Sequence, residues 1–148
     1  MIKILLIHGP NLNLLGKREP EIYGLSSLDE INEYLERFAE QNDVELRIYQ
    51  SNSEGDLVDI IQEAADWADG IVINPGAYTH YSYAIRDALS AIDLPSVEVH
   101  LSNIYAREDF RRRSVISEVV EGTIAGFGWR SYVCGLDGLI GIIKDRNS

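Results

Sequence analysis

Three histidines stand where they could transfer protons together, because each follows a short apolar segment of the chain. His8 comes directly after the first apolar run, His80 shortly after the third, and His100 directly after the fourth. Apolar runs of this kind are typical of strands buried in a parallel sheet. Ligands bind beyond the carboxyl ends of such strands, so we expect the three imidazoles at the same edge of the sheet.

The residues around these histidines favour acid–base chemistry over cofactor chemistry. The first loop, residues 9–16, lacks both the Walker pattern and the closely spaced glycines of a dinucleotide site. A phospho-acceptor domain would carry carboxylates where asparagines follow the first and third strands. A Schiff-base mechanism needs a lysine in the pocket, and none of Lys3, Lys17 and Lys144 is an obvious candidate. Proton transfer by Tyr, His and Arg side chains remains, and we expect no cofactor.

Strand-like and helix-like apolar patterns alternate along the chain, and these elements must position the polar residues. A capping box, Ser27-Leu-Asp-Glu30, opens one of the helices. The alternation predicts βαβ units and a parallel sheet. We therefore expect an α/β fold, a flavodoxin-like three-layer sandwich with a five-stranded parallel sheet, in a single domain of residues 1–148. The expected strands are 2–7, 44–48, 71–73, 97–99 and 123–127, and the expected helices are 28–39, 57–65, 84–92, 107–117 and 132–143.

Composition argues against several classes of function. The 148 residues carry a formal net charge of −11, which argues against nucleic-acid binding, since that affinity comes from Lys and Arg. The longest solid apolar run, residues 4–7, is far too short for a membrane span, and no secretory signal follows Met1. The single cysteine, Cys134, excludes an internal disulfide and a cysteine-based zinc cluster. We therefore expect a cytoplasmic protein without a metal site.

Four segments of the sequence closely resemble type II 3-dehydroquinate dehydratase. They are GPNLNLLG (9–16), REPEIYG (18–24), NPGAYTH (74–80) and VEVHLSN (97–103). The resemblance implies a cofactor-independent lyase that removes water from 3-dehydroquinate by anti elimination through an enolate, giving 3-dehydroshikimate. It also implies a role in the shikimate pathway of aromatic amino-acid biosynthesis, or in quinate catabolism, and a homo-oligomer of trimers assembled into a dodecamer.

The resemblance assigns proton abstraction to Tyr23. A free tyrosine has a pKa of about 10, so a phenolate base at neutral pH requires nearby cations. Arg18 resembles the loop arginine of the family, and Arg107 resembles its second tyrosine-directed arginine. Residues 16–24 carry Arg18 and Tyr23, and we expect this loop to be mobile without ligand and to close over the substrate.

The resemblance assigns proton donation to His100, which corresponds to the acid that protonates the departing C1 hydroxyl. Glu98 lies two residues earlier on the same strand face, and it corresponds to the glutamate that orients the histidine. Asn11 corresponds to the residue that stabilises the enolate oxygen through a water. Contacts to the substrate are expected from Asn74, His80, Asp87, Leu101, Ser102 and Arg111.

Asp87 is expected to reach into the site of a neighbouring subunit. Tyr78, Tyr81 and Tyr83 crowd the start of the same helix, and tyrosines of this kind favour interfaces. Tyr81 departs from the family, in which a small residue usually follows the motif histidine. Arg111 matches the position that grips the substrate carboxylate, since a guanidinium can bind a carboxylate through two parallel hydrogen bonds.

Two other functions remain open at the level of sequence. One is a catalytically silent flavodoxin-like module that binds a small molecule, which would need to have lost Tyr23, Arg18 or His100, and all three are present. The other is an FMN-binding electron carrier, which a colourless purified protein would exclude.

Overall fold

The computed structural model describes residues 1–23 and 26–148. Its centre is a five-stranded parallel sheet with the order β2-β1-β3-β4-β5, the order of a flavodoxin-like fold. The strands are β1 (Ile2–His8), β2 (Val44–Gln50), β3 (Gly70–Asn74), β4 (Ser96–His100) and β5 (Gly122–Ala125). All five predicted strands are confirmed. β5 ends before its predicted limit because Gly126 turns the backbone away at φ 98°.

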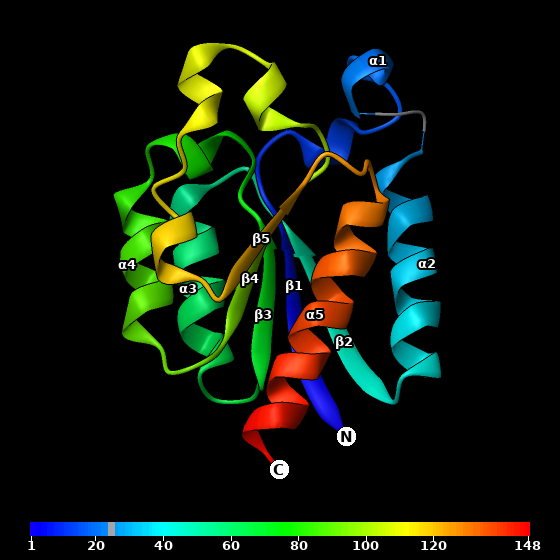
Figure 1. The fold of residues 1–148 in the computed structure, drawn as a ribbon, viewed down its shortest axis with the longest axis vertical. Helices are drawn as coiled ribbons and strands as arrows, with labels where there is room; N and C mark the ends of the chain where they lie inside the picture. Colours follow the sequence, from blue (N-terminus) through cyan, green and yellow to red (C-terminus); the bar gives the residue numbers. More distant parts are fainter. Residues whose placement is uncertain (24–25) are drawn as a thin grey trace.

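Helices cover both faces of this sheet (Figure 1). One face carries α2 (Leu28–Gln41) and α5 (Arg130–Arg146), and the other carries α3 (Glu54–Ala64) and α4 (Tyr83–Ala91). Successive residues of β1 pack on opposite sides, so that Leu6 belongs to the first core and Ile7 to the second. A strand buried on both faces is expected to be apolar throughout. The predicted three-layer sandwich is confirmed.

The capping box predicted at the start of α2 is confirmed. Ser27 Oγ accepts a hydrogen bond from the backbone N–H of Glu30 at 3.2 Å, and the Glu30 carboxylate accepts one from the N–H of Ser27 at 3.4 Å. These bonds satisfy N–H groups that the first turn of a helix leaves unpaired. They fix where α2 begins after the first long loop.

Two glycines let segments near the carboxyl ends of the strands approach closely. A Cβ atom on Gly9 would lie 2.7 Å from the carbonyl group of Pro75, so the loops after β1 and β3 pack directly against each other. On α5, a Cβ atom on Gly135 would lie 2.6 Å from Val99 Cγ1, which brings this helix onto β4. The loops that follow the strands gather at one end of the molecule, opposite both termini (Figure 1).

The segment after β4 differs from the helix predicted at 107–117. It forms three short 3-10 turns instead: η3 (Ile104–Ala106), η4 (Asp109–Arg112) and η5 (Ser117–Val119). The backbone N–H groups of Ile116 and Ser117 both donate to Ser114 Oγ at 3.0 Å. The N–H of Val115 donates to the Thr79 carbonyl at 2.7 Å. These groups are therefore unavailable to a helix, and a serine that bonds nearby backbone in this way competes with helix formation.

The first long loop carries two short elements, η1 (Leu12–Leu14) and α1 (Pro20–Tyr23). Gly24, at the end of the loop predicted to be mobile, lies outside the described residues, and the mobility of residues 16–24 stays a prediction. The loop after β3 forms η2 (Gly76–His80). Among the described residues, none of the helices has the length and apolar character needed to cross a membrane.

Candidate active site

Ten of the twelve residues predicted for the site line one pocket at the carboxyl edge of the sheet. The pocket has a volume of about 80 Å³, and it lies where the loops after β1, β3 and β4 meet. Ligand sites of doubly wound folds occur at such an edge. The predicted residues that line it are Asn11, Arg18, Tyr23, Asn74, His80, His100, Leu101, Ser102, Arg107 and Arg111.

Two arginines flank Tyr23 in this pocket. Arg107 Nη1 donates a hydrogen bond to the Tyr23 hydroxyl at 2.8 Å. The Arg18 guanidinium carbon lies 5.1 Å from the centre of the same ring, and that of Arg107 lies 5.2 Å away. Arg107 Nε is buried and has no hydrogen-bond partner within residues 1–23 and 26–148. Two segments far apart in the sequence, the loop with Arg18 and Tyr23 and the segment with Arg107, thus bring a phenol and two fixed positive charges together.

His100 is bound to the fully buried carboxylate of Glu98. The Nε2 atom of His100 lies 2.5 Å from Glu98 Oε2. An ionised carboxylate only accepts hydrogen bonds, so Nε2 carries a hydrogen and donates it. His100 also lines the pocket. Since Glu98 occupies Nε2, Nδ1 is the ring nitrogen left to exchange a proton with a ligand. The predicted pairing of Glu98 with His100 is present, although Glu98 itself lies behind the pocket wall.

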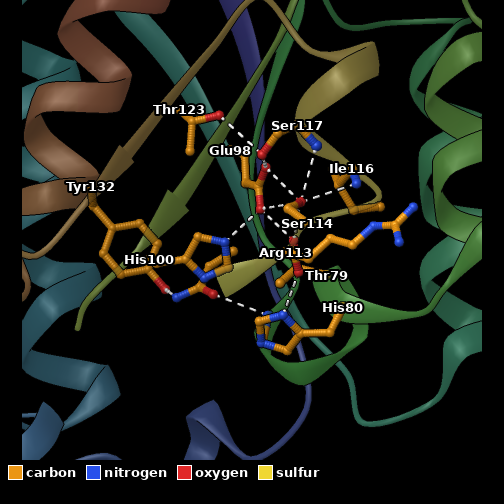
Figure 2. A network of polar contacts seen from close by, with 12 residues as sticks. Thr79, His80, Glu98, His100, Arg113, Ser114, Ile116, Ser117, Thr123 and Tyr132 are labelled. Atoms are coloured by element: carbon orange, nitrogen blue, oxygen red, sulfur yellow. Dashed lines mark hydrogen bonds and ion pairs between the residues drawn. The ribbon is translucent and has the colours of Figure 1, made fainter. Parts of the chain in front are cut away.

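The Glu98 carboxylate is the centre of a wider polar network (Figure 2). The hydroxyl of Ser117 donates to Oε1 at 2.5 Å, that of Ser114 lies 3.0 Å from Oε2, and that of Thr79 also donates to Oε2. Burial alone would raise the pKa of Glu98, but the hydrogen bond and charge of His100, together with the hydroxyls of Ser117 and Thr79, lower the pKa below its usual value. The carboxylate therefore stays ionised inside the protein.

Arg111 and His80 also line the pocket. Arg111 Nε donates to the exposed carboxylate of Glu108 at 2.7 Å, so the remaining N–H groups of this guanidinium are not used by that pair. His80 Nδ1 lies 2.7 Å from the Arg113 carbonyl. A carbonyl only accepts, so Nδ1 carries the hydrogen. Burial lowers the pKa of His80, and the charges of His100 and Arg111 lower it further. The hydrogen bond to the Arg113 carbonyl acts in the opposite direction but is outweighed.

The remaining site predictions are placed as follows. Asn11 is exposed, and its backbone adopts the left-handed conformation at φ 68° that asparagine tolerates. Its N–H donates to Asn52 Oδ1 at 3.0 Å, which holds the turn after β1. Asp87 lies on the exposed side of α4 and does not line the pocket. His8 lies at the same edge of the sheet but is fully buried behind the pocket.

Sequence reasoning missed the residues that support the site from behind. Thr79, Ser114 and Ser117 hold Glu98, and Tyr132 bonds to Asn74. Nothing in their spacing distinguishes these side chains from ordinary loop and helix residues, because each partner is far away in the sequence. Within the described residues, no group of three His, Cys, Asp or Glu side chains is arranged to hold a metal ion.

Comparison with known proteins gives the family. The family model described as "Dehydroquinase class II" matches residues 2–140. The chain belongs to this family. The resemblance drawn from the four sequence segments is confirmed, and the class II dehydroquinase relatives match over nearly their whole length.

Two curated relatives, both named 3-dehydroquinate dehydratase, are similar to the chain. The protein from Pelotomaculum thermopropionicum is 58% identical over 91% of this chain and 94% of its own length. The protein from Carboxydothermus hydrogenoformans is 57% identical over 99% of this chain and 96% of its own length. A solved type II dehydroquinase from Butyrivibrio crossotus superimposes with a TM-score of 0.93 at 48% identity, covering 94% of this chain and 97% of that one.

Proposed function

We propose that this class II dehydroquinase chain is a 3-dehydroquinate dehydratase, a hydro-lyase that forms 3-dehydroshikimate by anti elimination of water through an enolate, without a cofactor. One observation carries the proposal: a tyrosine with two arginines and a histidine paired with a buried carboxylate line the same pocket. The tyrosine supplies a base and the histidine supplies an acid for the same substrate. Family membership and the curated relatives support the same reaction.

Tyr23 acts as the base in this proposal. Its phenolate removes a proton from C2 of the substrate, next to the C3 carbonyl, and the electron pair moves onto the carbonyl oxygen as an enolate. A phenolate is stabilised by cations within a few ångströms, and Arg107 and Arg18 are the two guanidinium groups beside Tyr23. Asn11 lines the pocket and stabilises the enolate oxygen through a water.

His100 acts as the acid. It gives a proton from Nδ1 to the C1 hydroxyl, which leaves as water while the enolate collapses to the conjugated enone. Glu98 accepts the Nε2 hydrogen, which fixes the orientation of the imidazole and stabilises its protonated form. The proton taken by Tyr23 and the proton given by His100 balance, and solvent restores both residues after each turnover.

The substrate carboxylate binds at Arg111. The protein carries a formal net charge of −11, so an anion needs a local concentration of positive charge. Arg111 supplies it, with the N–H groups that its pair with Glu108 leaves free. Asn74, His80 and the backbone of Leu101 and Ser102 complete the binding contacts from the same pocket.

The proposal includes a cytoplasmic dodecamer built from trimers, with Asp87 contributing to a neighbouring site. Tyr83 is 59% exposed, and Tyr81 is 58% exposed. Asp87 is also exposed, one helical turn beyond Tyr83 on α4. A neighbouring subunit that covers these tyrosines would cover Asp87 with them. The proposal extends to biosynthesis of aromatic amino acids, or to quinate catabolism, as the process served.

Mixing the purified protein with 3-dehydroquinate tests the reaction directly. The product is a conjugated enone, so its absorbance should rise with time, and it should not rise with a Tyr23→Phe control at equal concentration. Binding of the substrate without any enone would contradict the proposal and favour a catalytically silent binding module. A yellow protein with a flavin spectrum would favour an FMN carrier.

A further inference from the structure

A buried chain of hydrogen bonds runs from α2 to the pocket wall behind Asn74. Asn74 Nδ2 donates to the Tyr132 hydroxyl at 3.0 Å, and that hydroxyl lies 2.7 Å from His8 Nδ1. His8 Nε2 in turn lies 2.8 Å from Asn32 Oδ1. Tyr132 and His8 are fully buried, and Asn74 is 3% exposed. The proposed elimination uses neither Tyr132 nor His8, so the cost of burying these polar groups needs another explanation.

In this chain of hydrogen bonds, the donor and the acceptor of every bond are determined by the groups involved. The backbone N–H of Gly76 donates to the Asn74 side-chain oxygen at 3.1 Å, so the Asn74 nitrogen must be the atom that faces Tyr132. The tyrosine oxygen accepts there, and its one hydrogen is left for His8 Nδ1. That nitrogen is therefore unprotonated. The hydrogen of His8 sits on Nε2 and is donated to Asn32.

Burial keeps both His8 and Tyr132 uncharged. It lowers the pKa of His8 to about 4 against the opposing effect of the Asn32 hydrogen bond. Burial also raises the pKa of Tyr132 far above its usual value. The two rings meet edge to face, with centres 4.9 Å apart, which further restricts their rotation. Near neutral pH, the direction of the chain therefore does not change.

We infer that Tyr132 and His8 are positioning residues for Asn74, which together hold its amide in one orientation. One N–H and one lone pair of that amide are used by Tyr132 and Gly76. A second N–H and a second lone pair remain, and Asn74 lines the pocket. The site thus offers a donor and an acceptor held in one orientation, which suits hydroxyl groups of a substrate. The inference rests on the proposed function for the identity of the ligand.

Kinetics of Tyr132→Phe test the inference, because this change removes only the hydroxyl. Asn74 then loses the partner that fixes its amide, and KM for 3-dehydroquinate should rise about tenfold while kcat changes less than about threefold. Tyr34→Phe, a matched change at an aromatic side chain that is 41% exposed, should leave both constants unaltered. An unchanged KM in Tyr132→Phe would overturn the inference.

A double variant separates positioning from general packing. With Asn74→Ala already in place, adding Tyr132→Phe should produce no further rise in KM, since there is no amide left to orient. A second rise as large as the first would mean that Tyr132 acts on the pocket by another route, and it would contradict the inference.

Nitrogen NMR of the wild-type imidazoles tests the hydrogen-bond chain without any need for activity. His8 should be neutral at pH 7, with its hydrogen on Nε2. A hydrogen on Nδ1 would overturn the assigned direction, and with it the inference. Absence of enone formation in the wild type would instead refute the proposed function, so the two failures are distinguishable.

Discussion

The two halves of the candidate site are held in different ways. His100 contacts a carboxylate that is fully buried and is bonded to hydroxyls from two further segments of the chain. Tyr23 lies at the end of a four-residue helix, is partly exposed, and receives one hydrogen bond from Arg107. The proposed acid is therefore fixed by the core of the fold, whereas the proposed base depends on contacts between two surface segments. Changes on the acid side should alter stability and catalysis together, and changes on the base side should alter catalysis alone.

The largest expected effect is that of Tyr23→Phe on turnover. Loss of a general base typically lowers the rate by about 10²–10⁴-fold. The melting temperature should stay close to that of the wild type, because, within residues 1–23 and 26–148, the hydroxyl bonds only to the partly exposed Arg107. Steady-state kinetics and thermal unfolding of the same preparation measure both. A large loss of stability in this variant would remove the contrast between the two halves.

Glu98→Gln should lower activity and stability together. In the wild type, both carboxylate oxygens accept hydrogens from the imidazole or the hydroxyls. The amide nitrogen of glutamine is a donor, so at least one of these hydrogens would lose its acceptor. Disrupting a buried ionic pair of this kind typically costs about 3 kcal/mol. Urea unfolding measures it. Glu118→Gln is the control, because its pair with Arg86 is exposed and should contribute less than about 1 kcal/mol.

Acidification should destabilise the protein through His8 before it affects Glu98. The folded pKa of His8 is about 4 against 6.5 for the free side chain, so between these values the unfolded state binds a proton that the folded state does not. The free energy of unfolding should therefore fall by about 3 kcal/mol as pH drops from 6.5 to 4. Above pH 6.5 this contribution is constant.

A pH series of urea unfolding curves checks this window, with His8→Gln as the comparison. The variant should lose less stability between pH 6.5 and 4.5, whatever its stability at pH 7. Glu98 has a lowered pKa, so the stability it provides is present above about pH 4.5 and is lost only as pH falls further. Equal slopes for wild type and variant above pH 4.5 would show that His8 does not titrate as expected.

The smallest expected effect distinguishes the centre of the Glu98 network from its rim. Ser117→Ala removes a 2.5 Å hydrogen bond to the carboxylate and should cost about 1.5–3 kcal/mol, since bonds to charged groups lie in that range. Thr123→Ala removes only a 3.4 Å contact to Ser117 and should cost less than about 0.5 kcal/mol. Thermal unfolding of the two variants side by side makes the comparison, and equal losses would contradict it.

The fold was predictable because its signals are local. The apolar run at the start of the chain reads as a buried strand, and the Ser27–Glu30 capping box marks a helix start within four residues. The edge at which the site lies followed from the fold, since a parallel sheet brings its strand ends together, whereas Tyr23, Arg18 and Arg107 were named from the family resemblance. The segment at 107–117 was predicted wrongly because the N–H of Val115 bonds to the Thr79 carbonyl and those of Ile116 and Ser117 bond to the Ser114 hydroxyl, rather than to helical carbonyls four residues earlier.

The supporting residues were not predictable for the same physical reason. Tyr132 reaches Asn74 across 58 positions of sequence, and Ser117 reaches Glu98 across 19. No periodicity encodes such pairs, because they depend on how separate loops and α5 pack together. Whether Asp87 completes a site depends on a second chain, so only reassembly of mixed Asp87→Ala and Tyr23→Phe subunits reports on it. Partial return of activity is the expected result.

Hydrogen exchange of the substrate in D₂O, followed by NMR, tests the division of labour between Tyr23 and His100 most directly. In His100→Ala, Tyr23 can still form the enolate, but the hydroxyl lacks its acid. Deuterium should then enter C2 of 3-dehydroquinate faster than product forms. In Tyr23→Phe, neither exchange nor product should appear above the rate of free solution. Exchange at an undiminished rate in Tyr23→Phe would contradict the assignment of Tyr23 as the base.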